Sequence, residues 1–164
     1  MKKILLLSDT HSHFDKQMLK HIAEADEVWH AGDIGDLKVT DTIEKHKTLR
    51  AVYGNIDDKN ARNQFPLDNK FTVEGVSVWI THIAGYPKRY IPRIREQFLY
   101  YQPKLFICGH SHILKVMYDK KYNHLHLNPG AVGKYGIHKV RTMLKFELDN
   151  GDIKNLAIIE LEKR

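Results

Sequence analysis

The sequence predicts an α/β protein in which two β-sheets pack face to face and helices cover their outer surfaces. The first third of the chain alternates short apolar runs, typical of buried strands, with segments of helical periodicity. The second half consists mainly of short segments of alternating polarity separated by turn residues, which is typical of antiparallel strands. Stacking two sheets with helices outside would bury the apolar sides of both kinds of element.

The first half of the chain is predicted to run strand, helix, strand, helix, strand. Strands are predicted over residues 3–8, 27–31 and 49–53, and helices over about 15–25 and 38–47. In the first helix, Met18, Leu19 and Ile22 follow the i, i+3, i+4 spacing of an apolar helix face. The polar stretch over residues 57–69 is expected to be irregular.

The second half is predicted to add a hairpin, one helix and further strands. The hairpin covers residues 71–80 around Gly75, the helix lies around 91–101, and a strand covers 104–108. Three more hairpin-like strands are predicted near 113–118, 122–127 and 140–148. The turn sequence Asp149-Asn150-Gly151-Asp152 precedes a final strand over 153–160.

Length and composition favour a single domain over residues 1–164. The sequence has no low-complexity segment and no apolar run near the roughly 20 residues that a membrane span needs. The single cysteine, Cys108, excludes an internal disulfide and favours a cytoplasmic location; its place in an apolar run indicates a buried small residue. The net charge of +6 is spread over the chain, so nucleic acid is not predicted as a partner.

Residues of metal-ligand type follow five of the predicted strands. They are Asp9 and His11, Asp33, Asn55, His82, and the pair His110 and His112, in the order of the strands. Loops at the carboxyl ends of strands in an α/β sheet converge over one crevice. Imidazole and carboxylate groups that meet there predict a site for divalent metal ions.

The order of these motifs resembles the calcineurin-like metallophosphoesterase superfamily. The matching segments are Asp9-x-His11, Gly32-Asp33, Gly54-Asn55, His82 and Gly109-His110-x-His112. Asn128-Pro129-Gly130 and the short length resemble its YfcE-type phosphodiesterases, relatives of the retromer subunit Vps29. The resemblance extends from Met1 to about Glu160 and implies the metallo-dependent phosphatase fold, a four-layer αββα sandwich of two mixed β-sheets.

The resemblance also implies two metal sites that share one ligand. It assigns Asp9, His11 and His112 to a first ion, Asn55, His82 and His110 to a second, and Asp33 to a bridging position. A shell of histidine, aspartate and asparagine suits Mn²⁺, Fe or Zn²⁺ better than Ca²⁺ or Mg²⁺. Mn²⁺ is expected by analogy, with Fe, Zn²⁺, Ni²⁺ or Mg²⁺ as alternatives.

The implied activity is hydrolysis of a phosphate ester, with a phosphodiester expected, by a hydroxide that bridges two metal ions. Asp33 and Asn55 are the residues expected to act in catalysis, Asn55 by neutralising charge on the phosphoryl oxygens together with the metals. A small phosphate ester, nucleotides included, is the expected substrate, and a homo-oligomer is left open. The alternative is a Vps29-like protein-interaction scaffold with little or no catalysis. The chemically competent residues at all seven ligand positions favour the enzyme.

Two positions depart from the family pattern. Many members carry a histidine after Gly-Asn that is thought to protonate the leaving group, whereas this chain has Ile56, which cannot donate a proton. Asp57 follows, and a loop-capping role is favoured for it over that of an acid. The acid therefore stays unassigned. After His82, where relatives often have His-Gly-His, the chain continues Ile83-Ala84-Gly85 without the second histidine.

Other polar residues are candidates for supporting roles. His30 ends the strand before Asp33 and is a candidate for a hydrogen bond to a metal ligand. His13 is a candidate for contact with substrate. Lys88 and Arg89 begin a basic segment that is either the solvent-exposed start of a helix or a rim that binds additional phosphate. The remaining histidines, His21, His46, His124, His126 and His138, are expected at the surface or in packing roles.

Overall fold

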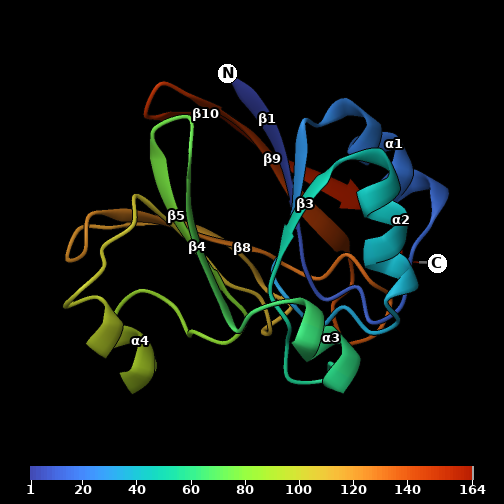
Figure 1. Cartoon of the computed structure of the whole chain (residues 1–164), viewed down its shortest axis with the longest axis horizontal. Coiled ribbons are helices and arrows are strands. Elements are labelled where there is room, and N and C mark those ends of the chain that lie inside the picture. The colour runs from blue at the N-terminus through green and yellow to red at the C-terminus, as the bar shows by residue number, and fades with distance from the viewer. Residues whose placement is uncertain (164) are drawn as a thin grey trace.

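Two five-stranded β-sheets lie face to face in the computed structural model, which describes residues 1–163 (Figure 1). The strand order is β10-β9-β1-β2-β3 in the first sheet and β4-β5-β6-β8-β7 in the second. Both sheets mix parallel and antiparallel pairs. Helices lie outside the two sheets, so the predicted α/β sandwich is confirmed.

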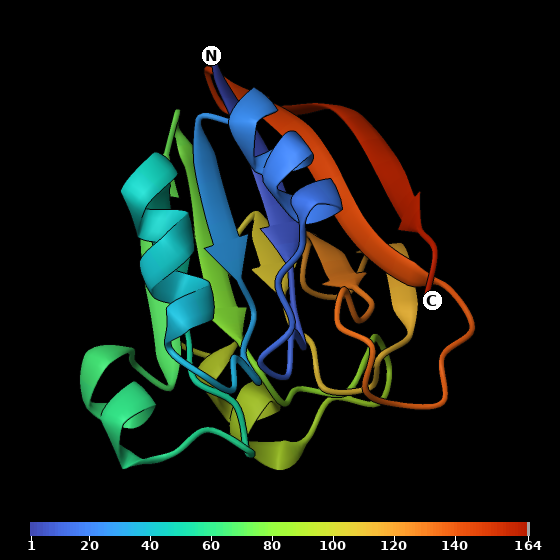
Figure 2. The same ribbon diagram turned by 90° about the vertical axis from the view of Figure 1, so that its right-hand side faces the viewer.

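The first sheet has parallel strands on one side and an antiparallel ribbon on the other. Its strands are β1 (Lys2–Leu7), β2 (Glu27–His30), β3 (Thr48–Ala51), β9 (Arg141–Asp149) and β10 (Asp152–Leu161). Helices α1 (Lys16–Glu24) and α2 (Lys38–His46) cover its outer face (Figure 2). α1 begins after Asp15, whose carboxylate accepts a hydrogen bond from the Met18 N–H at 3.0 Å. Met18 and Ile22 of this helix are buried in one cluster with Leu5 and Leu7 of β1.

The second sheet has parallel strands in the middle and antiparallel strands at its edges. Its strands are β4 (Asp68–Val73), β5 (Val76–Thr81), β6 (Leu105–Ile107), β7 (Leu114–Asp119) and β8 (His124–Pro129). The short helix α4 (Pro92–Gln97) and an aromatic cluster that includes Trp79 and Phe106 cover its outer face. Val78 and Ile80 point the other way and meet Ile4 of β1 between the sheets, because successive strand residues face opposite sides.

Three predicted elements need correction. The stretch expected to be irregular contains the helix α3 (Lys59–Gln64), which Asp58 caps; only Ala61 is buried in it, so it has no apolar periodicity to detect. The helix predicted around 91–101 ends at Gln97 and is followed by turns, with Leu99 and Tyr100 exposed. The strand predicted near 140–148 does not form a hairpin with its predecessor. As β9 it pairs with β1 in the other sheet, a partner that local sequence does not specify.

The loops that follow the parallel strands gather at one edge of the sandwich, opposite the N-terminus (Figure 2). The carboxyl ends of β1, β2, β3, β5 and β6 deliver these loops, so residues far apart in the sequence meet there. No helix in residues 1–163 is long and apolar enough to cross a membrane.

Candidate metal centre

The seven predicted metal ligands lie together at this edge. Asp9 and His11 follow β1, Asp33 follows β2, Asn55 follows β3, His82 follows β5, and His110 and His112 follow β6. Hydrogen bonds join loops of the two sheets. The His110 N–H donates to Oδ2 of Asp9 at 3.2 Å, and Nδ1 of His82 lies 2.7 Å from the Ala31 carbonyl oxygen.

The ligand atoms form two separate clusters. Asp9, His11 and His112 each bring one ligand atom within 4.8 Å of the others, and so do Asp33, His82 and His110. In the first cluster, Oδ1 of Asp9 lies 3.2 Å from Nε2 of His112. Oδ1 of Asn55 faces the second cluster, 3.1 Å from Nε2 of His82 and 3.0 Å from Nδ1 of His110.

Asp33 lies between the two clusters. Its Oδ2 is 3.3 Å from Nε2 of His11 in the first cluster, and its Oδ1 is 3.2 Å from Nε2 of His82 in the second. The Ile56 N–H donates to Oδ1 at 3.1 Å and fixes the orientation of the carboxylate. Each oxygen of one carboxylate therefore faces a different set of ligands.

The sequence comparison agrees with this geometry. Residues 1–151 match the sequence model of the calcineurin-like phosphoesterase superfamily domain. The chain belongs to this superfamily. Among proteins with curated descriptions, no sequence matches the chain significantly.

Three solved structures illustrate the same fold. A Thermotoga maritima protein is 24% identical with a TM-score of 0.73, covering 98% of this chain and 100% of its own. Vps29 of Entamoeba histolytica complexed with Zn²⁺ is 14% identical with a TM-score of 0.74, covering 99% of both chains. Vps29 of Chaetomium thermophilum complexed with a cyclic peptide is 13% identical with a TM-score of 0.68, covering 99% of this chain and 98% of its own. These likenesses show the fold.

The hydrogen bond of His82 fixes which of its ring nitrogens faces the second cluster. The Ala31 carbonyl can only accept, so Nδ1 of His82 must carry the hydrogen of this bond. In the neutral ring, Nε2 then has a lone pair, and it faces the oxygen atoms of Asp33 and Asn55, which are also acceptors. This arrangement is unfavourable unless a cation lies between the atoms or the ring carries a second proton.

The carboxylates and imidazoles of the two clusters shift one another's pKa. The carboxylates of Asp33 and Asp9 raise the pKa of His11 to about 9. Burial lowers the pKa of His82, but the same two carboxylates outweigh burial and the pKa is raised. Burial would raise the pKa of Asp9 and of Asp33, but the neighbouring histidines hold both below the usual range. Positive charge is therefore stabilised at this site, as protons or as metal ions.

The donor atoms fit divalent metal ions. Oδ1 of Asp9 and Nε2 of His11 are buried and make no hydrogen bond among residues 1–163. Buried polar atoms without partners are costly and rare, and a cation in the first cluster would satisfy both. Histidine nitrogens with carboxylate and amide oxygens are a donor set for Mn²⁺, Fe or Zn²⁺.

The backbone at the site is held in a conformation that side chains other than glycine rarely adopt. Positive φ angles occur at five of the seven ligands: Asp9 (55°), His11 (43°), Asp33 (55°), His110 (71°) and His112 (62°). Each such residue costs of the order of 1 kcal/mol or more, and strain of this kind clusters at functional sites. Gly54 shows how tight the loops are, because a Cβ there would lie 2.1 Å from Oδ1 of Asp33.

His30 contacts a residue between two ligands rather than a ligand itself. Its Nδ1 accepts a hydrogen bond from the Gly32 N–H at 3.1 Å, so Nε2 carries the ring hydrogen and donates to Oγ1 of Thr10 at 3.0 Å. Burial lowers the pKa of His30 to about 4, which keeps the ring neutral. His30 thus holds the loops that carry Asp9 and Asp33 in place.

The other supporting candidates lie in different surroundings. Nε2 of His13 lies 2.8 Å from Oδ2 of Asp15, the residue that caps α1. Lys88 and Arg89 are exposed. Asp57 is buried, and its carboxylate accepts hydrogen bonds from the N–H groups of Ile34, Gly35 and Gly54, which is a loop-capping arrangement.

Several residues beside the ligands were not singled out from the sequence. The Ser8 hydroxyl donates to Oδ2 of Asp9 at 2.6 Å. The ring of Tyr135 stacks on His11 with 4.8 Å between ring centroids, and the ring of His138, expected in a surface or packing role, meets His112 edge-on at 5.4 Å. The loop carrying Tyr135 and His138 reaches the site from the segment before β9, and no motif in the sequence marks it.

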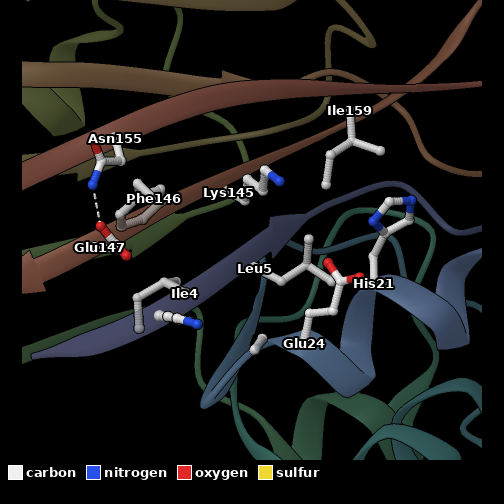
Figure 3. A pocket seen from close by; sticks show the side chains of 11 residues that line it. Ile4, Leu5, His21, Glu24, Lys145, Phe146, Glu147, Asn155 and Ile159 are labelled. Carbon is white, nitrogen blue, oxygen red and sulfur yellow. Dashed lines mark hydrogen bonds between the residues drawn. The ribbon is translucent and has the colours of Figure 1, made fainter.

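A separate cavity of about 320 Å³ lies on the first sheet, between α1 and the β9–β10 ribbon (Figure 3). Charges of both signs line it, from Lys3, Glu24, Lys145 and Glu147. Among residues 1–163, the only groups of three or more possible metal-ligand side chains are the two clusters at the strand ends. The two candidate ligand clusters therefore lie at the strand ends and not in this cavity.

Proposed function

We propose that the protein is a phosphoesterase that hydrolyses phosphodiesters with two divalent metal ions, Mn²⁺ being the first choice. The observation that carries the proposal is the position of Asp33, whose two oxygens face different ligand clusters. Membership of the calcineurin-like phosphoesterase superfamily supports a phosphate ester as the substrate.

Asp9, His11 and His112 would hold one ion, and Asn55, His82 and His110 the other, with Asp33 shared between them. When bound, two divalent ions lower the pKa of water and stabilise negative charge on a phosphoryl group. Asn55 has a second task in this arrangement. Its Oδ1 faces the second cluster, so its Nδ2 is the group left to donate a hydrogen bond to a phosphoryl oxygen.

Neither Ile56 nor Asp57, the two residues that follow Asn55, is suited to protonating the leaving group. Ile56 has no titratable group, three backbone N–H groups occupy the carboxylate of Asp57, and Asp15 binds His13. General acid catalysis typically contributes about 10²–10⁴-fold, so aryl esters with good leaving groups should react faster than alkyl esters by a factor of that order. Measuring kcat/KM over a graded series of leaving groups tests this preference. The variant Ile56→His should flatten the dependence if its ring reaches the leaving oxygen.

The proposal is tested by titrating the chelator-treated protein with Mn²⁺ in a calorimeter and by assaying bis(p-nitrophenyl) phosphate with and without Mn²⁺. We expect binding at micromolar Mn²⁺ and hydrolysis that chelator abolishes. The absence of bound transition metal at that concentration would overturn the proposal and favour the second candidate, a Vps29-like protein-interaction scaffold. Cytoplasmic location stays a prediction, and the oligomeric state stays open.

A further inference from the structure

A cavity of about 320 Å³ lies beside the second ligand cluster, and Asn55 and His82 both line it. One wall is formed by residues 53–67, which connect β3 to β4. The other wall is formed by residues 82–93, which connect β5 to α4 and reach into its first turn. A phosphoester bound at Asn55 and His82 would therefore have one of its groups next to this cavity.

The surface of the cavity is mainly apolar. Tyr53 and Leu67 contribute from one wall, and Ile83 and Ile91 from the other. Leu67 is 43% exposed and Ile83 36% exposed, although both are large apolar side chains. Exposed apolar side chains that meet in a concave site, with a few polar groups at one end, are typical of pockets for organic ligands.

The two arginines of the cavity are occupied by the protein itself. Arg93 forms an ion pair with Asp68 at 2.8 Å and donates to Oγ1 of Thr81 at 3.0 Å. Arg62 lies over the ring of Tyr53, 4.8 Å from its centroid, and its Nε donates to the Asp57 carbonyl at 2.8 Å. Both arginines therefore hold the walls in place. Among residues 1–163, no carboxylate lines the cavity, and apart from its polar end its surface is apolar.

We propose that this cavity binds an uncharged apolar ring of the substrate while the phosphoryl group lies at Asn55 and His82. The inference rests on the proposed function of the metal centre and names its substrate class, a phosphoester with an aryl or similar ring. The volume is at the lower end of the roughly 300–1,000 Å³ of ligand pockets, which suits one ring better than a dinucleotide.

Two phosphonates that the protein cannot hydrolyse test the cavity by binding alone. Phenylphosphonate and methylphosphonate carry the same anionic group and differ in the ring. Titrated into the Mn²⁺-loaded protein, phenylphosphonate should bind about tenfold more tightly, as expected for partial burial of an apolar group. The variants Ile83→Asn and Leu67→Asn should remove this preference and leave the affinity for methylphosphonate unchanged. They alter opposite walls, and both side chains are partly exposed, so folding should tolerate the exchange.

Ile158→Asn is the matched control, because Ile158 is 51% exposed on β10 in the first sheet and lies outside the cavity. It should keep the full preference for phenylphosphonate. Equal affinity of the parent for the two phosphonates, or a preference that survives both cavity variants, would overturn the inference. Hydrolysis of bis(p-nitrophenyl) phosphate is measured on the same samples. Hydrolysis without a preference for phenylphosphonate refutes only the inference that the cavity binds a ring. If the protein neither binds Mn²⁺ nor hydrolyses the ester, the proposed function is refuted.

Discussion

Two groups of histidines in this protein lie in opposite electrostatic environments. At the candidate metal centre, the carboxylates of Asp9 and Asp33 face His11 and His82 and raise the pKa of both rings. On the outer face of the second sheet, burial among aromatic rings lowers the pKa of His124 to about 4 and that of His126 to about 3. The difference teaches that carboxylates outweigh burial at His11 and His82, whereas burial outweighs the effect of Asp119 at His124.

The hydroxyl group of Tyr90 joins the outer pair, and Nδ1 of His124 makes no hydrogen bond among residues 1–163. The hydroxyl group of Tyr90 lies 2.9 Å from Nε2 of His124 and 2.8 Å from Nδ1 of His126. A hydroxyl group can donate to one neutral ring and accept from the other, so the three side chains form a neutral chain of hydrogen bonds. Phe98 and Phe106 pack around them, which gives this pair a structural role.

The largest contrast is expected in activity. Asp33→Asn removes the negative charge shared by the two clusters and should lower kcat/KM for bis(p-nitrophenyl) phosphate by at least about 10³-fold. His126→Asn, in the outer pair, should change it by less than about threefold, because His126 contacts no ligand side chain among residues 1–163. Steady-state kinetics at saturating Mn²⁺ measure both values. Similar losses in the two variants would break the comparison between the two groups.

Metal ions should stabilise the protein by binding at the strand-end clusters and not at His124 and His126. At an Mn²⁺ concentration 100 times its Kd, binding to the folded state contributes about 2.7 kcal/mol. For a chain of this size, that corresponds to a rise in Tm of about 5–10 °C. Differential scanning calorimetry should show this rise in the parent and in His126→Asn, and a clearly smaller rise in Asp33→Asn. A full rise in Asp33→Asn would show that the stabilising ion binds elsewhere.

His30 shares properties with both groups of histidines. It is buried and neutral like the outer pair, but it contacts the loops that carry the candidate ligands. His30→Ala should lower kcat/KM by about 10–100-fold through misplacement of the loops that carry Asp9 and Asp33. His13→Ala is the control, since His13 binds Asp15 outside the clusters and should have little effect. Kinetics and Tm are measured together. A loss with His30→Ala as large as that with Asp33→Asn would contradict its supporting role.

The outer pair should make stability depend on pH. The pKa of His126 is lowered to about 3 in the folded protein from an ordinary value of 6.5. Below pH 6.5 the unfolded chain therefore binds a proton that the folded state excludes, so the contribution of His126 is complete above pH 6.5 and is lost as the pH falls toward 3. Between pH 7 and pH 4.5 the loss should be about 2.5 kcal/mol, because pH 4.5 lies two units below the ordinary pKa and each unit corresponds to about 1.36 kcal/mol.

Urea unfolding in chelator, at both pH values, measures this loss for the parent and for His126→Asn. Subtracting the two pH dependences removes the contributions of titrating groups that do not interact with His126. The variant should lose less stability on acidification than the parent does. Parallel pH dependences would mean that His126 keeps its ordinary pKa in the folded state.

The amino-acid sequence by itself indicated the α/β class, the family and the seven ligand-type residues. It could do so because each ligand directly follows an apolar run that forms a buried strand, so residues such as Asp9 and His82 are marked by their neighbours in the chain. The helix α3 escaped prediction for the opposite reason, since only Ala61 in it is buried.

The tertiary structure alone decided how the residues of distant segments meet. It brought β9 into the first sheet, Tyr135 onto His11, and the residue 53–67 and 82–93 segments together around a cavity. It also separated the histidines that face carboxylates from the pair that Tyr90 joins. These outcomes depend on the packing of two sheets whose strands are paired across long stretches of sequence. The spacing of residues in the sequence does not predict that packing. Whether a histidine faces carboxylates or aromatic rings depends on the segment that packs against it.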